Sequence, residues 1–433
     1  MSQFRVVRGL LIGLAIVFAL AICASLGVRA AGAMRLSSAT ARFEKEVGPL
    51  SLLSFVKPRV PEERNAVTFL RPGVSAVILM TKDRSVVGTL ATKPCAEWTP
   101  KDLLDVAPLL ERNEPAFTIL RRAQGISESN WEIPYEKGND AKLPDLLGAM
   151  NAGKLVAARG RAALVRGDRE TALASTEILG TMASSYQQEA SLIVLLIGSA
   201  LERLQLGLVR ELVTAPQVDA AELDRLERSL GRADLDKAFR DTLRGEVAAM
   251  IQAIHGGQFD QEAPRVVPRA LVVGLGELLV ADMLDDRRTL EPSLFGPIKE
   301  PLREELRDAG WWKKLVAAYG ANTGSARARG IGTLSARELA KLSIGLRRKA
   351  IETGAYPASI PTSTDPVSGE PFVFEIASPG VRVRSTTSAE ILKSIYPVGS
   401  PLNAQLYSWT LPPASSRSTT PPPSPAVRRG GSS

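Results

Sequence analysis

Residues 151–184 read NAGKLVAARGRAALVRGDRETALASTEILGTMAS, a stretch in which helical periodicity is clear. Small and apolar residues recur every three or four positions, the spacing of one helix face: Leu155, Ala158, Ala162 and Val165 in its first half, and Ala172, Thr176, Leu179 and Ala183 in its second. Gly167 and Asp168 separate the halves, since glycine ends a helix readily and aspartate caps the next one. The stretch predicts two antiparallel helices in a mostly α protein.

Small residues on facing sides let the helices of this hairpin approach closely, as in tetratricopeptide-type hairpins. No second copy follows at a period of roughly 34 residues, so a multi-helix bundle is favoured over a repeat solenoid. We expect the helical body to cover residues 101–353. Its other helices are predicted at 101–110, 114–124, 188–214, 219–230, 235–254, 270–286, 300–319 and 335–352, and Thr99 is placed to cap the first.

Residues 354–411 predict a small β-hairpin element. Phe372 and Phe374 alternate with their neighbours before a turn at Ser378, Pro379 and Gly380, and a third strand is expected at 404–410. The remaining segment, 412–433, consists mostly of Pro, Ser, Thr, Gly and Arg. Such a composition offers almost nothing to bury, so we expect a disordered tail.

The amino-terminal segment 9–28 is a run of twenty residues without a charge, bounded by an arginine on each side. A helix of that length is about 30 Å long, the thickness of a bilayer's hydrocarbon core. The run predicts a transmembrane helix, with residues 1–8 as a short cytoplasmic amino terminus. We expect residues 29–100 to form a juxtamembrane helix over 33–47 and then short helices and loops separated by prolines.

Two other interpretations of the apolar run stay open. Ala31–Gly32–Ala33 has the small residues of a signal-peptide cleavage site, although the run exceeds the roughly 7–15 apolar residues usual in such signals. Leu20–Ala21–Ile22–Cys23 has the form of a lipoprotein signal, but a bulky isoleucine precedes the cysteine. We favour a retained single-pass anchor in the cell membrane. Because long domains translocate largely regardless of charge, we expect the body on the periplasmic side.

A second apolar stretch, 190–201, has twelve residues between Glu189 and Glu202. Extending it to the length of a membrane span would bury charges at about 2.5–3.5 kcal/mol each near the bilayer centre. We therefore expect a buried helix of the body here.

The formal net charge is +8, but the charge lies at the two ends of the chain. Residues 1–35 carry four arginines and residues 412–433 carry three, and neither segment contains an acid, which leaves +1 for the body. A near-neutral body with basic ends does not favour binding to nucleic acid.

Few side chains indicate catalysis. The chain has one histidine and two cysteines, and neither a Gly-x-Ser-x-Gly nor a Walker A motif. His255 precedes two glycines, which indicates a helix end where glycine takes the left-handed conformation. Three carboxylates fall on one helical face and suit a hard cation, but two arginines follow them, which favours a solvated helix end: Asp282, Asp285 and Asp286. We expect no catalytic residue, metal or cofactor.

Trp311 and Trp312 are adjacent, between Gly310 and two lysines. Neighbouring residues on a helix diverge by about 100°, so one tryptophan packs inside when the other faces outward. We favour an arrangement in which the two tryptophans belong to the core and the rim of the same bundle. The outward-facing tryptophan would then be a candidate partner contact.

The segment 354–374 contains a Gly-x-Tyr-Pro element and an Asp-Pro-x-x-Gly turn that leads into an aromatic strand. The motif residues are Tyr356, Pro357, Asp365, Pro366 and Gly369. It resembles the carboxy-terminal motif of type II secretion pseudopilins, and also the end of a group of uncharacterised bacterial proteins with one amino-terminal span and a long helical body. The likeness implies a helix end, a turn and a strand, with Asp365 and Glu370 as candidate calcium ligands. Asp365 and Pro366 also suit the first positions of a type I turn.

These features predict a single-pass, membrane-anchored envelope protein that acts as a non-catalytic scaffold or interaction module. Its expected partners are the lipid bilayer, through residues 9–28, and another protein. One alternative, from segment 354–374, is an accessory component of a type II secretion or pilus-like system. A second is an enzyme of unknown substrate that uses carboxylates alone.

Overall fold

The computed structural model describes residues 2–231, 233–256, 268–288, 323–360, 363–377, 380–395 and 405–414. The predicted helix at 300–319, with Trp311 and Trp312, lies outside the described residues, as does almost all of the predicted disordered tail. The described part is mostly α-helical with one small sheet, which confirms the predicted fold class.

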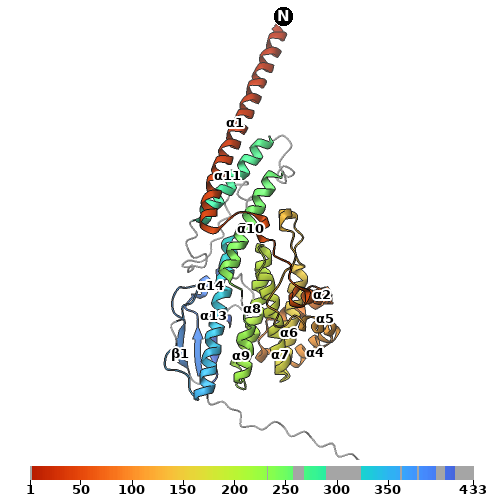
Figure 1. The fold of residues 1–433 in the computed structure, drawn as a ribbon, viewed down its shortest axis with the longest axis vertical. Coiled ribbons are helices and arrows are strands. Elements are labelled where there is room, and N and C mark those ends of the chain that lie inside the picture. Colours follow the sequence, from red (N-terminus) through yellow and green to blue (C-terminus); the bar gives the residue numbers. More distant parts are fainter. Residues whose placement is uncertain are drawn as a thin grey trace, which may run out of the picture.

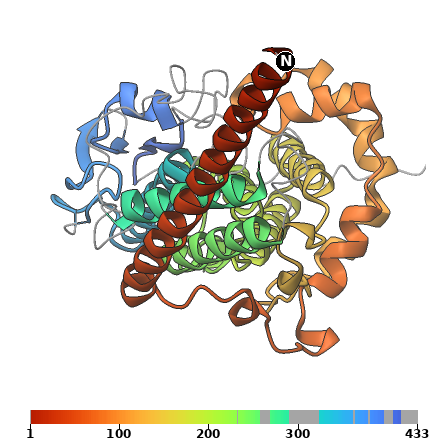
Figure 2. The ribbon, with the colours of Figure 1, turned by 90° about the horizontal axis from the view of Figure 1, so that it is seen from above.

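The amino-terminal part begins with one long helix, α1 (Ser2–Val47), so the predicted span and the predicted helix at 33–47 are continuous. Short elements then curve around one side of the bundle, while the sheet lies on the opposite side (Figure 2). In chain order they are η1 (Leu52–Phe55), η2 (Glu62–Arg64), α2 (Val67–Ser75), α3 (Thr81–Leu90), η3 (Cys95–Glu97), α4 (Pro100–Arg112), α5 (Glu114–Arg121) and η4 (Tyr135–Asp140). Thr99 caps α4 as expected, with its hydroxyl accepting from the Asp102 backbone N–H at 3.3 Å.

The bundle is built around the predicted hairpin. It consists of α6 (Leu146–Val165), α7 (Arg169–Gln187), α8 (Leu192–Thr214), α9 (Ala220–Ser229), α10 (Leu235–His255), α11 (Arg269–Arg288) and α13 (Thr323–Thr353), as Figure 1 shows. Gly167 ends α6 with φ of 81°, and the Asp168 carboxylate accepts from the Thr171 backbone N–H at 3.0 Å. Helix α8 packs on both α6 and α7, and most of its residues are buried. The apolar stretch 190–201 is thus part of a core helix, as predicted.

The carboxy-terminal part is a three-stranded antiparallel sheet beside α13. Its strands pair in the order β1 (Val373–Ala377), β2 (Gly380–Arg384) and β3 (Ser408–Leu411), with α14 (Ala389–Ile395) between the last two. The third strand begins four residues later than predicted, because residues 405–407 form a helical turn. Leu406 and Tyr407 are buried there, and the Tyr407 hydroxyl donates to the Gly332 carbonyl at 2.9 Å. Helix α13 begins twelve residues earlier than predicted, and α14 was not predicted at all.

Replacing Gly180 by alanine is expected to lower the free energy of unfolding by about 1–3 kcal/mol, because the new methyl group would overlap with its neighbours. A Cβ atom at this position would lie 2.5 Å from Gln205 Nε2 and would also meet the Ser229 carbonyl oxygen. Gly345 on α13 is the matched control, since a Cβ there meets nothing within 4 Å. Gly345→Ala is expected to raise stability by about 0.5–1 kcal/mol through helix propensity. Urea unfolding in detergent measures the free energy of unfolding of both variants. Equal changes in the two variants would contradict the close packing around Gly180.

Candidate membrane-anchoring site

In the first half of α1, the apolar side chains that the structure describes are exposed. Every residue from Ala15 to Ala24 is exposed, and Phe18 is 69% exposed. This part of α1 extends beyond the other helices (Figure 1). Among the described residues, α1 and α8 are the helices long and apolar enough to cross a membrane, and α8 is mostly buried. An apolar helix surface left in water is unfavourable, and a bilayer would cover it.

Three helices join this half of α1 to the body, and we call them the neck. The neck comprises α1 from Ser25 to Val47, α10 from Val247 to His255, and α11. Buried positions on α1 are separated by three, four or seven residues, that is, by one or two helical turns: Ser25, Gly32, Leu36, Ala39 and Phe43. From Leu36 onward this stripe packs with apolar residues of α10 and α11 in one cluster. The spacing is that of a helix with one buried face.

Two glycines allow α1 and α11 to approach closely in the neck. A Cβ atom on Gly32 would lie 2.5 Å from the Gly274 carbonyl oxygen, and one on Gly274 would lie 2.7 Å from the Arg29 Cα. Neither contact tolerates a side chain, so glycine is required at both positions. Small residues at a helix contact are typical of helices that associate in or near membranes.

A buried carboxylate lies beside this contact. Glu277 of α11 is 2% exposed at its side chain and pairs with Arg29 of α1. The His255 Nε2 lies 3.1 Å from Glu277 Oε1, so the only imidazole of the chain lies in the neck, at the end of α10. The predicted helix end at His255 is confirmed. Gly256, the C-cap, has φ of −74°, and Gly257, the next candidate for the left-handed conformation, lies outside the described residues. The sequence did not predict that Arg29, His255 and Glu277 meet. Glu277 is the one charged residue of the apolar sequence 270–281, and this was a signal that its side chain has a specific partner.

The predicted carboxylate group is only partly described. Asp282 pairs with Arg35 of α1, with 2.6 Å between Oδ1 and Nη2, so it has a structural partner in the neck. The side chains of Asp285 and Asp286 lie outside the described residues. No group of three His, Cys, Asp or Glu residues that could hold a metal occurs in the part of the chain that the structure describes.

Asp365, the first residue of the predicted turn, is fully buried. Its carboxylate accepts from the Ser335 hydroxyl of α13 at 2.6 Å, from the Thr387 hydroxyl at 2.9 Å and from the Ser385 hydroxyl. Its backbone carbonyl accepts from the Gly369 N–H at 2.8 Å, which closes a five-residue turn at the position of the predicted turn. Asp365 therefore fastens the turn to α13 and to the segment after β2. Glu370 is exposed.

Tyr356, in the other half of the motif, holds the end of β3. Its hydroxyl donates to the Pro412 carbonyl at 2.8 Å, and its ring packs against the main core. Burial raises the pKa of this hydroxyl. The buried Arg347 donates to the Pro216 carbonyl at 3.0 Å, which ties α13 to the end of α8. Pro357 and Pro366 are half-buried. The motif residues thus have structural roles in the fold.

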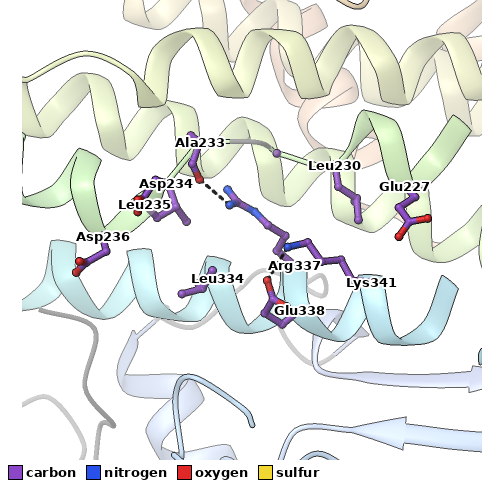
Figure 3. A pocket seen from close by; sticks show the side chains of 11 residues that line it. Glu227, Leu230, Ala233, Asp234, Leu235, Asp236, Leu334, Arg337, Glu338 and Lys341 are labelled. Carbon is purple, nitrogen blue, oxygen red and sulfur yellow. Dashed lines mark hydrogen bonds and ion pairs between the residues drawn. The ribbon is translucent and has the colours of Figure 1, made fainter. Parts of the chain in front are cut away.

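A cleft of about 480 Å³, lined by both charged and apolar residues, lies between α13 and the turn from α9 to α10. Figure 3 shows Arg337 reaching from α13 across this cleft to the Ala233 carbonyl, with 2.8 Å between Nη1 and the oxygen. The same guanidinium binds the buried Glu202 of α8 through Nε at 2.5 Å and Nη2 at 2.8 Å. This ion pair links residues 135 positions apart and was not predicted. At the rim, Lys341 pairs with Glu338.

Comparison with known protein families, with curated proteins and with solved structures finds no match for this chain.

Proposed function

We propose that the chain is a single-pass membrane protein whose first helix anchors a helical scaffold or interaction module at the cell membrane, with the body on the periplasmic side. The observation that carries this proposal is the exposed apolar half of α1. Each Leu, Ile, Phe or Val in a span contributes roughly −0.3 to −0.6 kcal/mol to insertion. Segment 9–28 contains eleven such residues, which favours insertion by several kcal/mol.

The neck supports a retained anchor over a cleaved signal peptide. Gly32 lies in the middle of Ala31–Gly32–Ala33, and it is buried against α11. Cleavage after Ala33 would remove Arg29 and Gly32, and with them a partner of the buried Glu277. A buried charge without its partner is costly, so the neck would lose stability.

Flotation on liposomes tests the anchor. The wild-type chain is expected to float with the lipid, and the double variant Val17→Arg, Phe18→Arg is expected to remain largely in the soluble fraction. Each arginine near the bilayer centre opposes insertion by about 2.5–3.5 kcal/mol. The matched control is Leu104→Arg on α4, another exposed apolar side chain but one in the body. A wild-type chain that stays with the soluble fraction, or a double variant that floats as well as the control, would count against the anchor.

The scaffold part of the proposal needs a protein partner at the body. The cleft beside Arg337 is our candidate contact, because charged side chains from α9, α10 and α13 line it together with apolar ones. A photoreactive residue in place of Lys341 is expected to crosslink a defined partner in cells, whereas the same residue at Leu104 is not. A partner captured equally from both positions, or from neither, would contradict a docking role for the cleft.

Segment 354–374 supports the alternative of an accessory component of a secretion or pilus-like system. The helix α13 ends before Gly354, which has φ of 75°, and the Asp365 turn leads into β1, an order of elements like that implied by the resemblance. Crosslinking in cells followed by purification tests this alternative. Recovery of a pseudopilin or secretin with the chain would favour it, and recovery of the chain without either would count against it.

A further inference from the structure

Helix α11 runs in the same direction as α1 and begins beside the apolar run. Two contacts establish the direction: Gly274 faces Val28 and Arg29, and further along the pair Asp282 meets Arg35. Position 274 of α11 is therefore level with the end of the predicted span. Figure 1 shows the start of α11 on the side of the protruding part of α1.

The start of α11 extends further toward the membrane than this contact. Arg269 precedes Gly274 by five residues, or about 7 Å of helix. On α1, Ser25 is buried although it lies within the apolar run and its neighbours Ala24 and Leu26 are exposed. The buried face of α1 therefore extends beyond Val28 toward the amino terminus. The first residues of α11 lie at this same end of the contact between the two helices.

The exposed side of this first part of α11 is apolar. Residues 270–276 read ALVVGLG, without a charge or a strongly polar side chain. Leu275 is 47% exposed, and Leu271 and Val272 are half-buried. The first acid, Glu277, faces the neck and pairs with Arg29. Nothing on the described surface of 270–276 opposes contact with lipid.

We propose that the first two turns of α11, residues 269–276, insert into the membrane surface beside α1 and form a second lipid contact. This inference rests on the proposed anchor. A hydrocarbon core of about 30 Å needs the whole of segment 9–28, which places Val28 at its boundary and the first turn of α11 at or inside it. Keeping Arg269 in water would leave residues 9–22 for the span, about 21 Å of helix, which is too short.

Fluorescent labels on single cysteines test this second contact. The background is Cys23→Ser. Burial raises the pKa of the Cys95 thiol to about 12, so this thiol reacts slowly at neutral pH. Labels are placed at Leu271→Cys, Leu275→Cys and, as a control further from the membrane, Asp282→Cys. The labelled full chain is reconstituted in phosphatidylcholine vesicles and quenched either by nitroxide lipids or by aqueous iodide.

The ratio of lipid quenching to iodide quenching is expected to fall along the helix, with position 271 several-fold above position 282 and position 275 between them. The exposed position 275 keeps the test valid if Leu271→Cys disturbs the neck. Equal ratios at the three positions, in a chain that floats with the vesicles, would overturn the second contact and leave the anchor intact. A chain that does not float would overturn both.

Discussion

Replacing Glu202 by alanine is expected to lower the free energy of unfolding by about 3–5 kcal/mol, because it leaves Arg337 charged and buried without its partner. Both side chains are almost wholly buried, and two nitrogens of the guanidinium bind the two carboxylate oxygens. Gln187 also donates to Glu202 at 2.6 Å, so the variant leaves a second donor unpaired. Urea unfolding of the detergent-solubilised chain measures the loss.

A double variant separates the ion pair from simple packing. Glu202→Met with Arg337→Met is expected to cost much less than the sum of the two single variants, since it removes both charges from the interior. Asp105→Ala is the matched control, because the Lys101–Asp105 pair on α4 is exposed and should contribute less than about 1 kcal/mol. Additive losses in the double variant, or a loss at Glu202 no larger than at Asp105, would contradict a buried, coupled pair.

Asp365→Ala is expected to lower stability by about 2–3 kcal/mol, since three hydroxyl donors from α13 and from the segment after β2 would lose their shared acceptor. The loss should be local to the sheet and its junction with α13. Hydrogen exchange measures it: backbone amides of β1 and β2 should exchange faster, while those of α6 and α7 should not.

Two further variants define the role of this carboxylate. Asp365→Asn keeps the size and an acceptor oxygen, so it is expected to recover much of the lost protection. Glu370→Ala, in the same turn but exposed, should leave exchange unchanged. If Glu370→Ala had the same effect as Asp365→Ala, the buried hydroxyl network would not explain the stability of the turn.

Local sequence patterns predicted most helices because their causes are local. Gly167 and Asp168 end one helix and cap the next through contacts within a few residues, and Thr99 caps α4 in the same way. The early start of α13 and the helix α14 were missed. Helix α14 contacts α13, so its position depends on tertiary packing that a local pattern does not contain.

The candidate site was predictable only in part. The apolar run and the juxtamembrane helix were visible in the sequence, but the neck was not. Its contacts join Gly32 to Gly274 and Arg29 to Glu277, residues more than two hundred positions apart. A single sequence gives no means of pairing such positions. The same holds for Glu202 and Arg337, which lie 135 positions apart and meet in the interior through packing.

The mass of the mature protein in fractionated cells tests the anchoring of the body most directly. We expect a chain of 46.4 kDa that keeps the segment 9–28 and stays in the membrane fraction after alkaline extraction. A soluble product that begins near residue 34 would contradict the account, because the body would then be a secreted globular protein without a tether.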